Sequence, residues 1–516
     1  MRFNQRQHQP TTINHEGTKA YVLPDKAQLI TSVTNSFMYG SYYKSQSQEL
    51  QDFQDVVRNV AAEDPEFVLR TAAYARSIMN MRTSAVLLLV VAANIPTCKP
   101  FVRQWATHVI RRPDEIQEVM GAQMEMYGKP IPNSIKKAIG DAFERFNEYR
   151  LEKWNKTGVQ YSFGNVLRMV HPKGSTPEKG ALFHYLVHGW DNLSPEQKKL
   201  LPYIKAKKQF SKLKSFGPKA QQLLLKYKFP WENVISKFPE AWEHVEFPYM
   251  AGLRNLRNLI EKASKDKVRS VCDMIRNPER VASGKQLPFR YYSALKALGT
   301  TAGPGYGFVQ DALEEAVEHS IGNIDLPGSS FITCDVSASM TFSLSPRSDM
   351  TPKEIGLLFG AALARASKDN ILSVFGQNHV VVPVQNSVLS TMKYADGMNV
   401  GHSTNAHLAL EWLIHNKKKV DRVVIFSDMQ VYTTFGYTYG YDGALKPLWK
   451  KYKKEVNPEA RLYSFDLNTY GSSQFADGDP SVTLLAGWSS QALRNIKLSE
   501  QDPRGIVQLV NDYCPS

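Results

Sequence analysis

The stretch FITCDVSASM, residues 331–340, decides the fold of the C-terminal part of this chain. Its first half reads as a buried strand, and the strand runs directly into Asp-x-Ser-x-Ser. A carboxylate and two hydroxyls at the end of a buried strand have three interpretations: a metal site, a serine nucleophile or a helix-capping turn. The sequence that follows this stretch distinguishes between them.

Short β-rich runs alternate with helical segments after residue 328. The runs are SSFITCDV, NILSVFG, HVVVPV, RVVIFSDM and ARLYSFDL, and the helical segments are 353–368, 406–418 and 445–456. This alternation predicts a parallel sheet covered by helices, an α/β fold of the Rossmann type. Ligands of such sheets bind beyond the carboxyl ends of the strands. We therefore expect Asp335, Ser337 and Ser339 to lie at the ligand-binding edge.

Two more polar loops fall at the same predicted edge. GHSTN (401–405) offers the hydroxyl of Thr404, and SDM (427–429) offers the carboxylate of Asp428. Hard oxygen donors from three loops suit Mg²⁺, Mn²⁺ or another divalent cation. The predicted metal site has Ser337, Ser339 and Thr404 as direct ligands, with Asp335 and Asp428 reaching the ion largely through water.

The two competing interpretations have less support. A serine nucleophile usually lies in a Gly-x-Ser-x-Gly elbow with a nearby base, and this stretch has no elbow. His379, His402 and His407 show no clear pairing with it. A metal-dependent hydrolase is also disfavoured, because the site has two carboxylates and no obvious general base. We therefore expect no enzyme activity, and helix capping remains the structural alternative.

Residues 48–320 show helical periodicity with little strand-like alternation. The helical segments are 49–63, 65–78, 100–112, 114–128, 134–154, 179–190, 219–229, 267–277 and 308–321. Many short helices without strands predict stacked helix pairs, a solenoid of the HEAT type. The longest apolar run, AVLLLVVAA (85–93), is too short to span a bilayer and predicts a buried helix.

Positive charge is concentrated in the middle of the chain. Residues 151–300 hold 27 Lys and Arg against 12 Asp and Glu, a net +15, whereas the whole chain carries +14. A concentrated basic surface attracts polyanions by counterion release, although a solvated lysine-rich face is the alternative. Within 205–228, lysines alternate with Phe210, Phe216 and Tyr227, a pattern suited to single-stranded nucleic acid.

The stretch YSFGNVLRMVHPKGSTPEKGALFHYLVHGW (161–190) predicts two helices joined by a basic loop. Arg168, His171 and Lys173 would cluster where these helices meet. His184 and His188 have the i, i+4 spacing of a metal pair, but no third ligand is evident, which favours ordinary helix-face histidines. Further basic residues downstream are Arg254, Arg257, Lys262, Lys285 and Arg290.

The cysteines and the N-terminus indicate the compartment. Cys98, Cys272, Cys334 and Cys514 form no close pair, so neither a disulfide framework nor a cysteine-based zinc site is expected. The polar N-terminus lacks the apolar run of a signal peptide. These features predict a cytoplasmic protein without a membrane segment.

The three polar loops give residues 329–516 a resemblance to a von Willebrand factor A domain with a metal-ion-dependent adhesion site. The metal in such sites keeps one position open for a carboxylate of a partner, which implies binding rather than catalysis. With LRMVHPKG, GLRNL and CDVSASM, residues 20 to 516 resemble the Ro autoantigen ribonucleoproteins, whose helical module is called TROVE. The resemblance implies a TROVE-like RNA-binding domain over 20–325 and an A domain over 326–516.

The resemblance also implies a function. The helical repeats would form a ring closed by the A domain, in a monomer that binds small noncoding Y-like RNAs and single-stranded 3′ ends of misfolded or damaged RNA. An exoribonuclease, or another protein that docks a carboxylate on the metal, is an expected partner in RNA quality control or the stress response. The alternative is a magnesium-dependent protein–protein adaptor. The expected RNA contacts are Arg168, His171, Lys173, Arg254, Arg257, Lys285 and Arg290.

The sequence departs from the family pattern in two places. SFGN (162–165), which leads to Arg168, carries less charge than expected from relatives. In GHSTN, His402 and Ser403 stand where relatives tend to have Gly-Gly, which bears on the selectivity for the metal. The Tyr- and Gly-rich loop VYTTFGYTYGYDG (431–443) is predicted beside the metal, where it would shape what docks.

Overall fold

The computed structural model divides into two compact units, each described here by itself. The helical unit consists chiefly of Val60–Ser77 and Met81–Val271, and the sheet unit comprises Met1–Asn59, Ile78–Asn80 and Cys272–Cys514. The structure describes residues 12–13, 19–34, 46–156, 158–299, 305–324, 326–343, 350–430, 445–468, 472–473, 475, 481–486, 496, 500 and 506–515.

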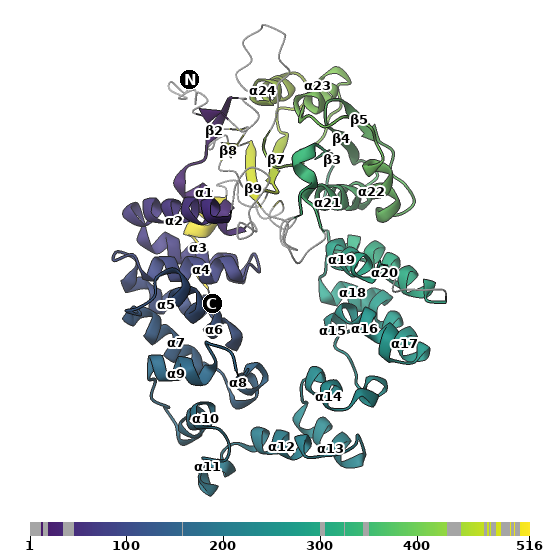
Figure 1. The fold of residues 1–516 in the computed structure, drawn as a ribbon. Coiled ribbons are helices and arrows are strands. Elements are labelled where there is room, and N and C mark those ends of the chain that lie inside the picture. The colour runs from purple at the N-terminus through teal and green to yellow at the C-terminus, as the bar shows by residue number, and fades with distance from the viewer. Residues whose placement is uncertain are drawn as a thin grey trace. The chain divides into compact units, whose positions relative to one another are not determined.

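The helical unit begins with stacked helix pairs (Figure 1). Helices α3, α5, α7 and α9 pack one on the next, and α4, α6 and α8 form a second row against them. Their bounds are α3 Pro65–Ser77, α4 Thr83–Ala93, α5 Lys99–Val109, α6 Pro113–Met126, α7 Asn133–Arg145, α8 Glu148–Trp154 and α9 Phe163–Val170. The predicted all-α, HEAT-like fold class is thus confirmed, while closure into a ring stays a prediction.

The second half of the helical unit consists of further helices, most of them of ten residues or fewer. They are α10 Pro177–His188, α11 Pro195–Lys199, α12 Pro202–Ser211, α13 Pro218–Tyr227, α14 Trp231–Lys237, α15 Tyr249–Arg254, α16 Leu256–Lys262 and α17 Lys265–Arg276, the last of which crosses into the sheet unit. Proline at the first helical position, where an N–H has no helical partner, opens several of them and fixes where they start.

Local sequence explains two features of the stacked helices. Asp64 caps α3, because its Oδ1 accepts a hydrogen bond from Phe67 N at 3.2 Å. Helix α4 is apolar on all sides, and every residue from Ser84 to Ala93 is buried, as expected of a helix enclosed by its neighbours.

The single helix predicted over 134–154 is wrong. Two helices, α7 and α8, occupy this range, with the chain extended at Phe146 between them. Phe146 is buried, and the Asn147 side chain accepts a hydrogen bond from Arg150 N at 2.9 Å. The capping preference of asparagine therefore starts a new helix where the apolar periodicity alone suggested continuity.

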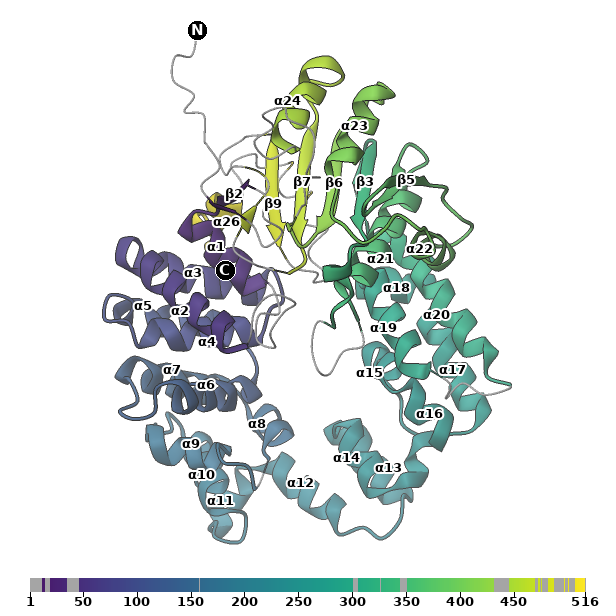
Figure 2. The same ribbon diagram turned by 45° about the horizontal axis from the view of Figure 1, so that its top comes forward.

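The sheet unit contains a six-stranded sheet in the order β5-β4-β3-β6-β7-β9, with β5 antiparallel and the other neighbours parallel (Figure 2). The strands are β3 Ser330–Asp335, β4 Ile371–Phe375, β5 His379–Val382, β6 Arg422–Ser427, β7 Arg461–Asp466 and β9 Val482–Ala486. The α/β class is confirmed, and five of these strands match the predicted runs. Strands β4 and β5 are added on one side of β3, whereas β6, β7 and β9 are added on the other, so the order of the strands reverses between β3 and β6. Such a switch point is where folds of this kind bind ligands.

Helices cover both faces of this sheet. Helix α21 (Pro352–Ala366) packs on β3, β4 and β6, and α22 (Val388–Asp396) packs on α21. The other face packs against α23 (His407–His415) and α24 (Leu445–Glu455) through a core that includes Phe331, Trp449 and Tyr452. Both faces of β3 and β6 are therefore buried, and their polar residues matter where the strands end.

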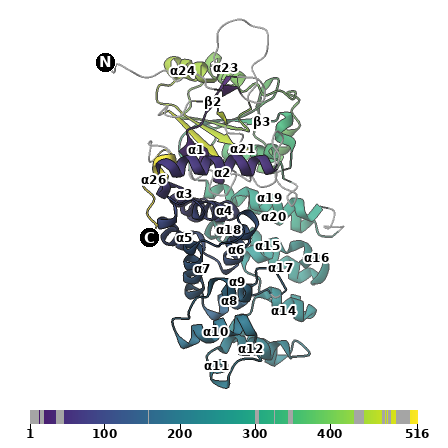
Figure 3. The ribbon, with the colours of Figure 1, turned by 60° about the vertical axis from the view of Figure 1, so that its left-hand side comes forward.

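Segments from the N-terminal region also belong to the sheet unit. Strand β2 (Lys19–Val22) pairs with β1 (Thr12–Ile13) and with β8 (Ser472–Ser473). Helix α1 (Asp25–Thr34) packs on β9 and on α26 (Ile506–Asn511), as Figure 3 shows. The other helix of this N-terminal region is α2, Gln46–Glu63.

Three helices that precede β3 also pack within the sheet unit. They are α18 (Pro278–Gly284), α19 (Pro288–Leu298) and α20 (Gly307–Ser320). Lys296 of α19 pairs with Glu354 of α21 at 2.8 Å, and Arg365 of α21 pairs with Glu318 of α20 at 2.8 Å. Across the described part of the chain, no helix is both long and apolar enough to span a membrane.

Candidate metal site and nucleic-acid interface

The three predicted metal loops meet at the switch point. Strands β3 and β6 pair in parallel with Cys334 opposite Phe426, so Asp335 and Ser427 end neighbouring strands. The first and second loops are joined by a hydrogen bond from Ala338 N to His402 O at 3.2 Å. The exposed fractions of the predicted metal residues are Asp335 0%, Ser337 1%, Ser339 5%, Thr404 3% and Asp428 0%.

Hydrogen bonds fix the first loop in place. Asp335 Oδ1 accepts from Ser337 N at 2.9 Å, and the hydroxyls of Ser337 and Ser339 lie 3.3 Å apart. Asp335 Oδ2 accepts from Ser427 Oγ at 2.6 Å. Ser427 is a positioning residue that sequence reasoning missed. Its signal was its place directly before Asp428, at the end of the strand beside β3.

Without a cation, the charges of the buried carboxylates Asp335 and Asp428 would destabilise the folded protein. Burial, and then the neighbouring charge of Asp428, raise the pKa of Asp335 well above its ordinary range, while hydrogen bonds from Ser337 and Ser427 oppose that rise. Two buried carboxylates that face each other fit a small hard cation, which would offset their desolvation and repulsion. The three hydroxyls and two carboxylates are also the oxygen donors that such an ion takes. The predicted residues therefore fit a divalent ion.

The second and third loops carry backbone strain and close contacts. Met429, directly after Asp428, has φ +62°, a left-handed conformation that costs about 1–3 kcal/mol in a non-glycine residue. Gly376 packs so closely on Gly401 that a methyl group added to Gly376 would lie 2.3 Å from the Gly401 carbonyl oxygen.

Among the described residues no three His, Cys, Asp or Glu side chains cluster as metal ligands. The predicted loop 431–443 lies outside the described residues.

His379 is a half-buried residue of the edge strand β5 that packs against aromatic rings. Its ring lies 6.1 Å from those of Phe331 and Trp412, and burial lowers its pKa to about 4. Burial also lowers the pKa of His407. The His379 ring is therefore neutral at pH 7 and packs as an aromatic group.

His379 should make a contribution to the stability of the sheet unit that is lost in mild acid. An unfolded histidine takes up a proton below about pH 6.5, but the folded one resists protonation until about pH 4. This contribution is therefore lost as the pH falls below 6.5, by about 1–2 kcal/mol between pH 7 and pH 5, and it opposes the contribution of Asp335, whose raised pKa acts in the other direction. Urea unfolding of the wild type and of His379→Phe at both pH values isolates the histidine as the difference between the two proteins, with the wild type losing more stability, or gaining less, than the variant. An unchanged pH dependence in that variant would contradict the assignment.

Arg168, His171 and Lys173 come together at the C-terminal end of α9. All three are exposed, and His171 ends the helix with φ +54°. Arg168 Nη2 donates to Val187 O at 2.6 Å, and its Nη1 donates to Asn165 Oδ1 at 3.2 Å. The guanidinium therefore also ties α9 to α10. All three residues are thus exposed near one helix end, and part of the sequence signal of this motif is structural.

The glycines and Lys179 of the same motif have packing roles. A methyl group on Gly164 would lie 2.5 Å from the Leu186 carbonyl oxygen, and one on Gly174 would lie 2.5 Å from Gly180 N. Lys179 Nζ donates to the carbonyls of Phe143 and Phe146 at 3.1 and 2.6 Å. Lys179 thus caps the C-terminal end of α7 and holds the basic loop against it.

The other predicted RNA contacts are more scattered. Arg254 on α15 and Arg257 on α16 are exposed, and Arg257 lies 3.4 Å from Glu261. Lys285 and Arg290 belong to the sheet unit, where Lys285 is exposed and Arg290 lies over the Phe289 ring. Of the predicted RNA contacts, Arg168, His171 and Lys173 share one helix end, whereas the others lie on separate elements.

The aromatic residues of the lysine-rich segment do not form an open stacking surface. Phe210 is buried against Phe229 and Phe238, so its prediction as a base-stacking residue is wrong. Phe216 stacks on His244, and Tyr227 stacks on Phe229. The short helices of this region need aromatic residues for their own core.

The rings of His184 and His188 lie 4.7 Å apart between their centroids, and His184 bonds Gln197, which fits ordinary helix-face histidines.

Comparison with known proteins decides the family. The TROVE domain matches residues 17–302, more than half of the chain, and the Ro60 vWA domain matches residues 330–498. The chain belongs to the Ro family of TROVE proteins. Both modules expected from the motifs are present in the expected order.

Individual relatives of this Ro family member differ widely in size. Telomerase protein component 1 of Rattus norvegicus is 26% identical over 344 residues, and that of Mus musculus is 24% identical over 345 residues. The matches cover 55% and 54% of this chain and 13% of each relative. The crystal structure of the Deinococcus radiodurans RO (RSR) protein matches with a TM-score of 0.64 and 17% identity. That match covers 92% of this chain and 99% of the other and shows a shared fold.

Proposed function

We propose that this protein is the RNA-binding component of a ribonucleoprotein. The observation that carries the proposal is the exposed cluster of Arg168, His171 and Lys173, held at one end of α9 in a TROVE module. Lys and Arg at a rigid helix end suit phosphate contacts, and the net +15 of residues 151–300 supports binding to a polyanion. Membership of the Ro family supports RNA as that polyanion.

The proposed ligands are small noncoding Y-like RNAs and the single-stranded 3′ ends of misfolded or damaged RNA. The proposed setting is RNA quality control or the stress response in the cytoplasm, with the protein as a non-enzymatic monomer. The four free cysteines, Cys98, Cys272, Cys334 and Cys514, support a reducing compartment. An exoribonuclease is the proposed protein partner, because such an enzyme would act on the RNA ends that this protein holds.

Charge reversal at the cluster tests this proposal. The double variant Arg168→Glu, Lys173→Glu should bind a labelled hairpin RNA with a single-stranded tail at least 20-fold more weakly at 0.1 M salt, since two phosphate contacts are lost and two repulsions added. Filter binding would measure the change. Reversing Lys136 and Lys156, exposed or half-exposed lysines of the same unit, provides the control.

Thermal unfolding must accompany this test, because Arg168 also bonds the Val187 carbonyl. A second variant, Lys173→Glu alone, removes no hydrogen bond between described side chains and should give at least half of the loss on a logarithmic scale. Equal binding by the cluster variant and the control would show that these residues do not contact RNA.

A second candidate function is that of an adaptor that binds a partner protein through the A domain. The observation that favours it is the buried set of Asp335, Ser337, Ser339, Thr404 and Asp428 at the switch point. With Mg²⁺ bound there, the site would supply an electrophilic position for a carboxylate of the partner. This function is compatible with RNA binding by the other unit.

A further inference from the structure

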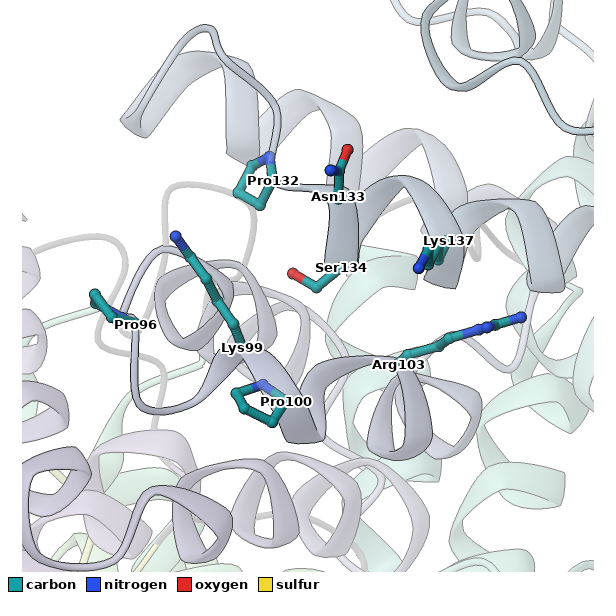
Figure 4. A pocket seen from close by; sticks show the side chains of 8 residues that line it. All are labelled: Pro96, Lys99, Pro100, Arg103, Pro132, Asn133, Ser134 and Lys137. Atoms are coloured by element: carbon teal, nitrogen blue, oxygen red, sulfur yellow. The ribbon is translucent and has the colours of Figure 1, made fainter.

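A cavity of about 560 Å³ opens between the N-terminal ends of α5 and α7 in the helical unit (Figure 4). Its lining consists of cationic residues, prolines and two small polar residues. They are Pro96, Lys99, Pro100, Arg103, Pro132, Asn133, Ser134 and Lys137. The cavity size is typical of a site for a small ligand group rather than of a packing defect.

The charge of this cavity is not neutralised by its surroundings. Arg103 makes a bidentate pair with Asp141, with Nε–Oδ2 2.7 Å and Nη2–Oδ1 2.9 Å. Lys99 and Lys137 form no ion pair with any described residue, and both are exposed. Three cations against one carboxylate leave a net +2 at the cavity. The Arg103–Asp141 pair also links α5 to α7 and so fixes the width of the cavity.

The hydrogen-bond donors of this cavity, like its charge, favour an anionic ligand. Pro132, the residue before α7, offers no side-chain acceptor, and the first helical bond runs from Lys136 N to Pro132 O. The amides of Asn133 and Ser134 therefore precede the first helical bond, at the positive end of the helix dipole. The Ser134 hydroxyl oxygen is buried and has no hydrogen-bond partner among the described residues. Figure 4 shows Ser134 on the α7 side of the cavity, facing the α5 residues.

We propose that this cavity is a phosphate-binding subsite, with Lys99 and Lys137 as cations and Ser134 as hydroxyl donor. Cations, helix-start amides and a hydroxyl are the donors that phosphate oxygens accept from. A carboxylate ligand would need fewer donors, and an apolar ligand would leave the two lysines unpaired. The phosphate belongs either to the backbone of bound RNA or to a free phosphate ion.

The position along α7 favours the RNA backbone. The basic loop packs on the same helix, since a methyl group on Gly140 would lie 3.5 Å from Pro172 Cβ. Ser134 and Gly140 are six residues apart, about 9 Å along a helix. A single strand of RNA that contacts His171 and Lys173 would therefore reach the cavity within a few nucleotides. This part of the inference rests on the proposed RNA-binding function.

The test compares three variants of the full chain. In Lys99→Gln, Lys137→Gln two phosphate contacts are lost, so the slope of log Kd against log salt should fall by about 1.4 for single-stranded RNA, or about 20-fold in affinity at 0.1 M salt. Lys136→Gln, Lys156→Gln has the same net charge and should leave the slope unchanged. Ser134→Ala keeps the charge and should weaken binding a few-fold without changing the slope. Fluorescence anisotropy with a labelled uridine 16-mer provides the readout.

Inorganic phosphate separates the two sources of the ligand. Selective ¹⁵N-serine labelling lets the Ser134 amide be followed during a phosphate titration. We expect a saturable shift in the wild type that disappears in Lys99→Gln, Lys137→Gln. A shift with unchanged RNA affinity would assign the site to free phosphate and overturn the RNA assignment.

The remaining outcomes are also decisive. If the wild type binds no RNA, the proposed function fails, but the phosphate titration still decides whether the cavity binds phosphate. If the cavity and control variants weaken RNA binding equally and the Ser134 amide does not respond, the cavity is no phosphate site. Equal weakening alone would show that the lysines act only through overall charge.

Discussion

Asp335→Asn is expected to stabilise the metal-free protein and to abolish its stabilisation by Mg²⁺. The raised pKa of Asp335 means that the folded, ionised carboxylate is disfavoured beside Asp428. Metal-free wild type therefore loses stability as the pH rises from about 4 through the raised pKa. Asparagine removes this charge, so the variant should be about 2–3 kcal/mol more stable at pH 8, a rise in Tm of about 4–8 °C.

The hydrogen bonds around residue 335 tolerate this exchange. The asparagine oxygen still accepts from Ser337 N, and the Ser427 hydroxyl, which donates to Oδ2 in the wild type, rotates to accept from the new amide. The exchange thus removes the charge of residue 335 while keeping its shape and its hydrogen bonds. Loss of the Mg²⁺ response together with a gain in metal-free stability is the result specific to a metal held between buried carboxylates.

Thermal unfolding with and without Mg²⁺ measures both effects, and Asp421→Asn is the matched control. Asp421 precedes β6 at the opposite edge of the sheet, where it accepts from Ser329 N at 2.7 Å and its pKa is lowered chiefly by that bond. Its replacement should destabilise the protein and leave the Mg²⁺ response intact. A wild type that does not respond to Mg²⁺ between pH 7 and 8 would refute the metal site.

Gly164→Ala is expected to destabilise the helical unit by about 3 kcal/mol. The added methyl group would lie 2.5 Å from the Leu186 carbonyl oxygen, a backbone atom that cannot move without shifting α10. Overpacking of this kind typically costs about 1–3 kcal/mol, and here it also strains the bond from Arg168 to Val187 O. RNA binding should weaken as well, because the basic cluster is held by the same pair of helices.

Gly180→Ala provides a control on α10. A methyl group there meets nothing within 4 Å, so the exchange should be neutral or stabilise the helix by about 0.4–1 kcal/mol. Urea unfolding of both variants, followed by circular dichroism, would measure the difference. Equal stability of the two variants would show that α9 and α10 are not packed as closely as described.

The meeting of the predicted metal loops at one edge of the sheet was predictable because it follows from strand order. Asp335 and Asp428 each follow a short buried run, and parallel strands bring such positions to one edge of a sheet. No comparable rule revealed Ser427, whose role depends on β6 pairing directly with β3 rather than with another strand. Strand neighbours far apart in sequence are set by the whole fold, not by local pattern.

The elements that the sequence did not predict also depend on contacts set by the rest of the fold. The four-residue run KAYV becomes β2, the middle strand between β1 and β8, and β8 lies far away in sequence. Strand β9 and helix α22 also went unpredicted, since short apolar runs carry little periodicity. In the lysine-rich segment, the burial of Phe210 could not be read from its basic neighbours, because burial depends on the helices that pack on it.

The packing of α1 on β9 and α26 has a consequence for the order of events at the ribosome. Domains generally fold as units while the chain is being made, so the helical unit can complete its core early. Helix α1 is synthesised before the helical unit, whereas β9 and α26 follow that unit in the chain. The apolar face of α1 therefore stays uncovered by these neighbours until they have been made. Arrest of translation before β9 would leave a folded helical unit preceded by a helix without its packing partners.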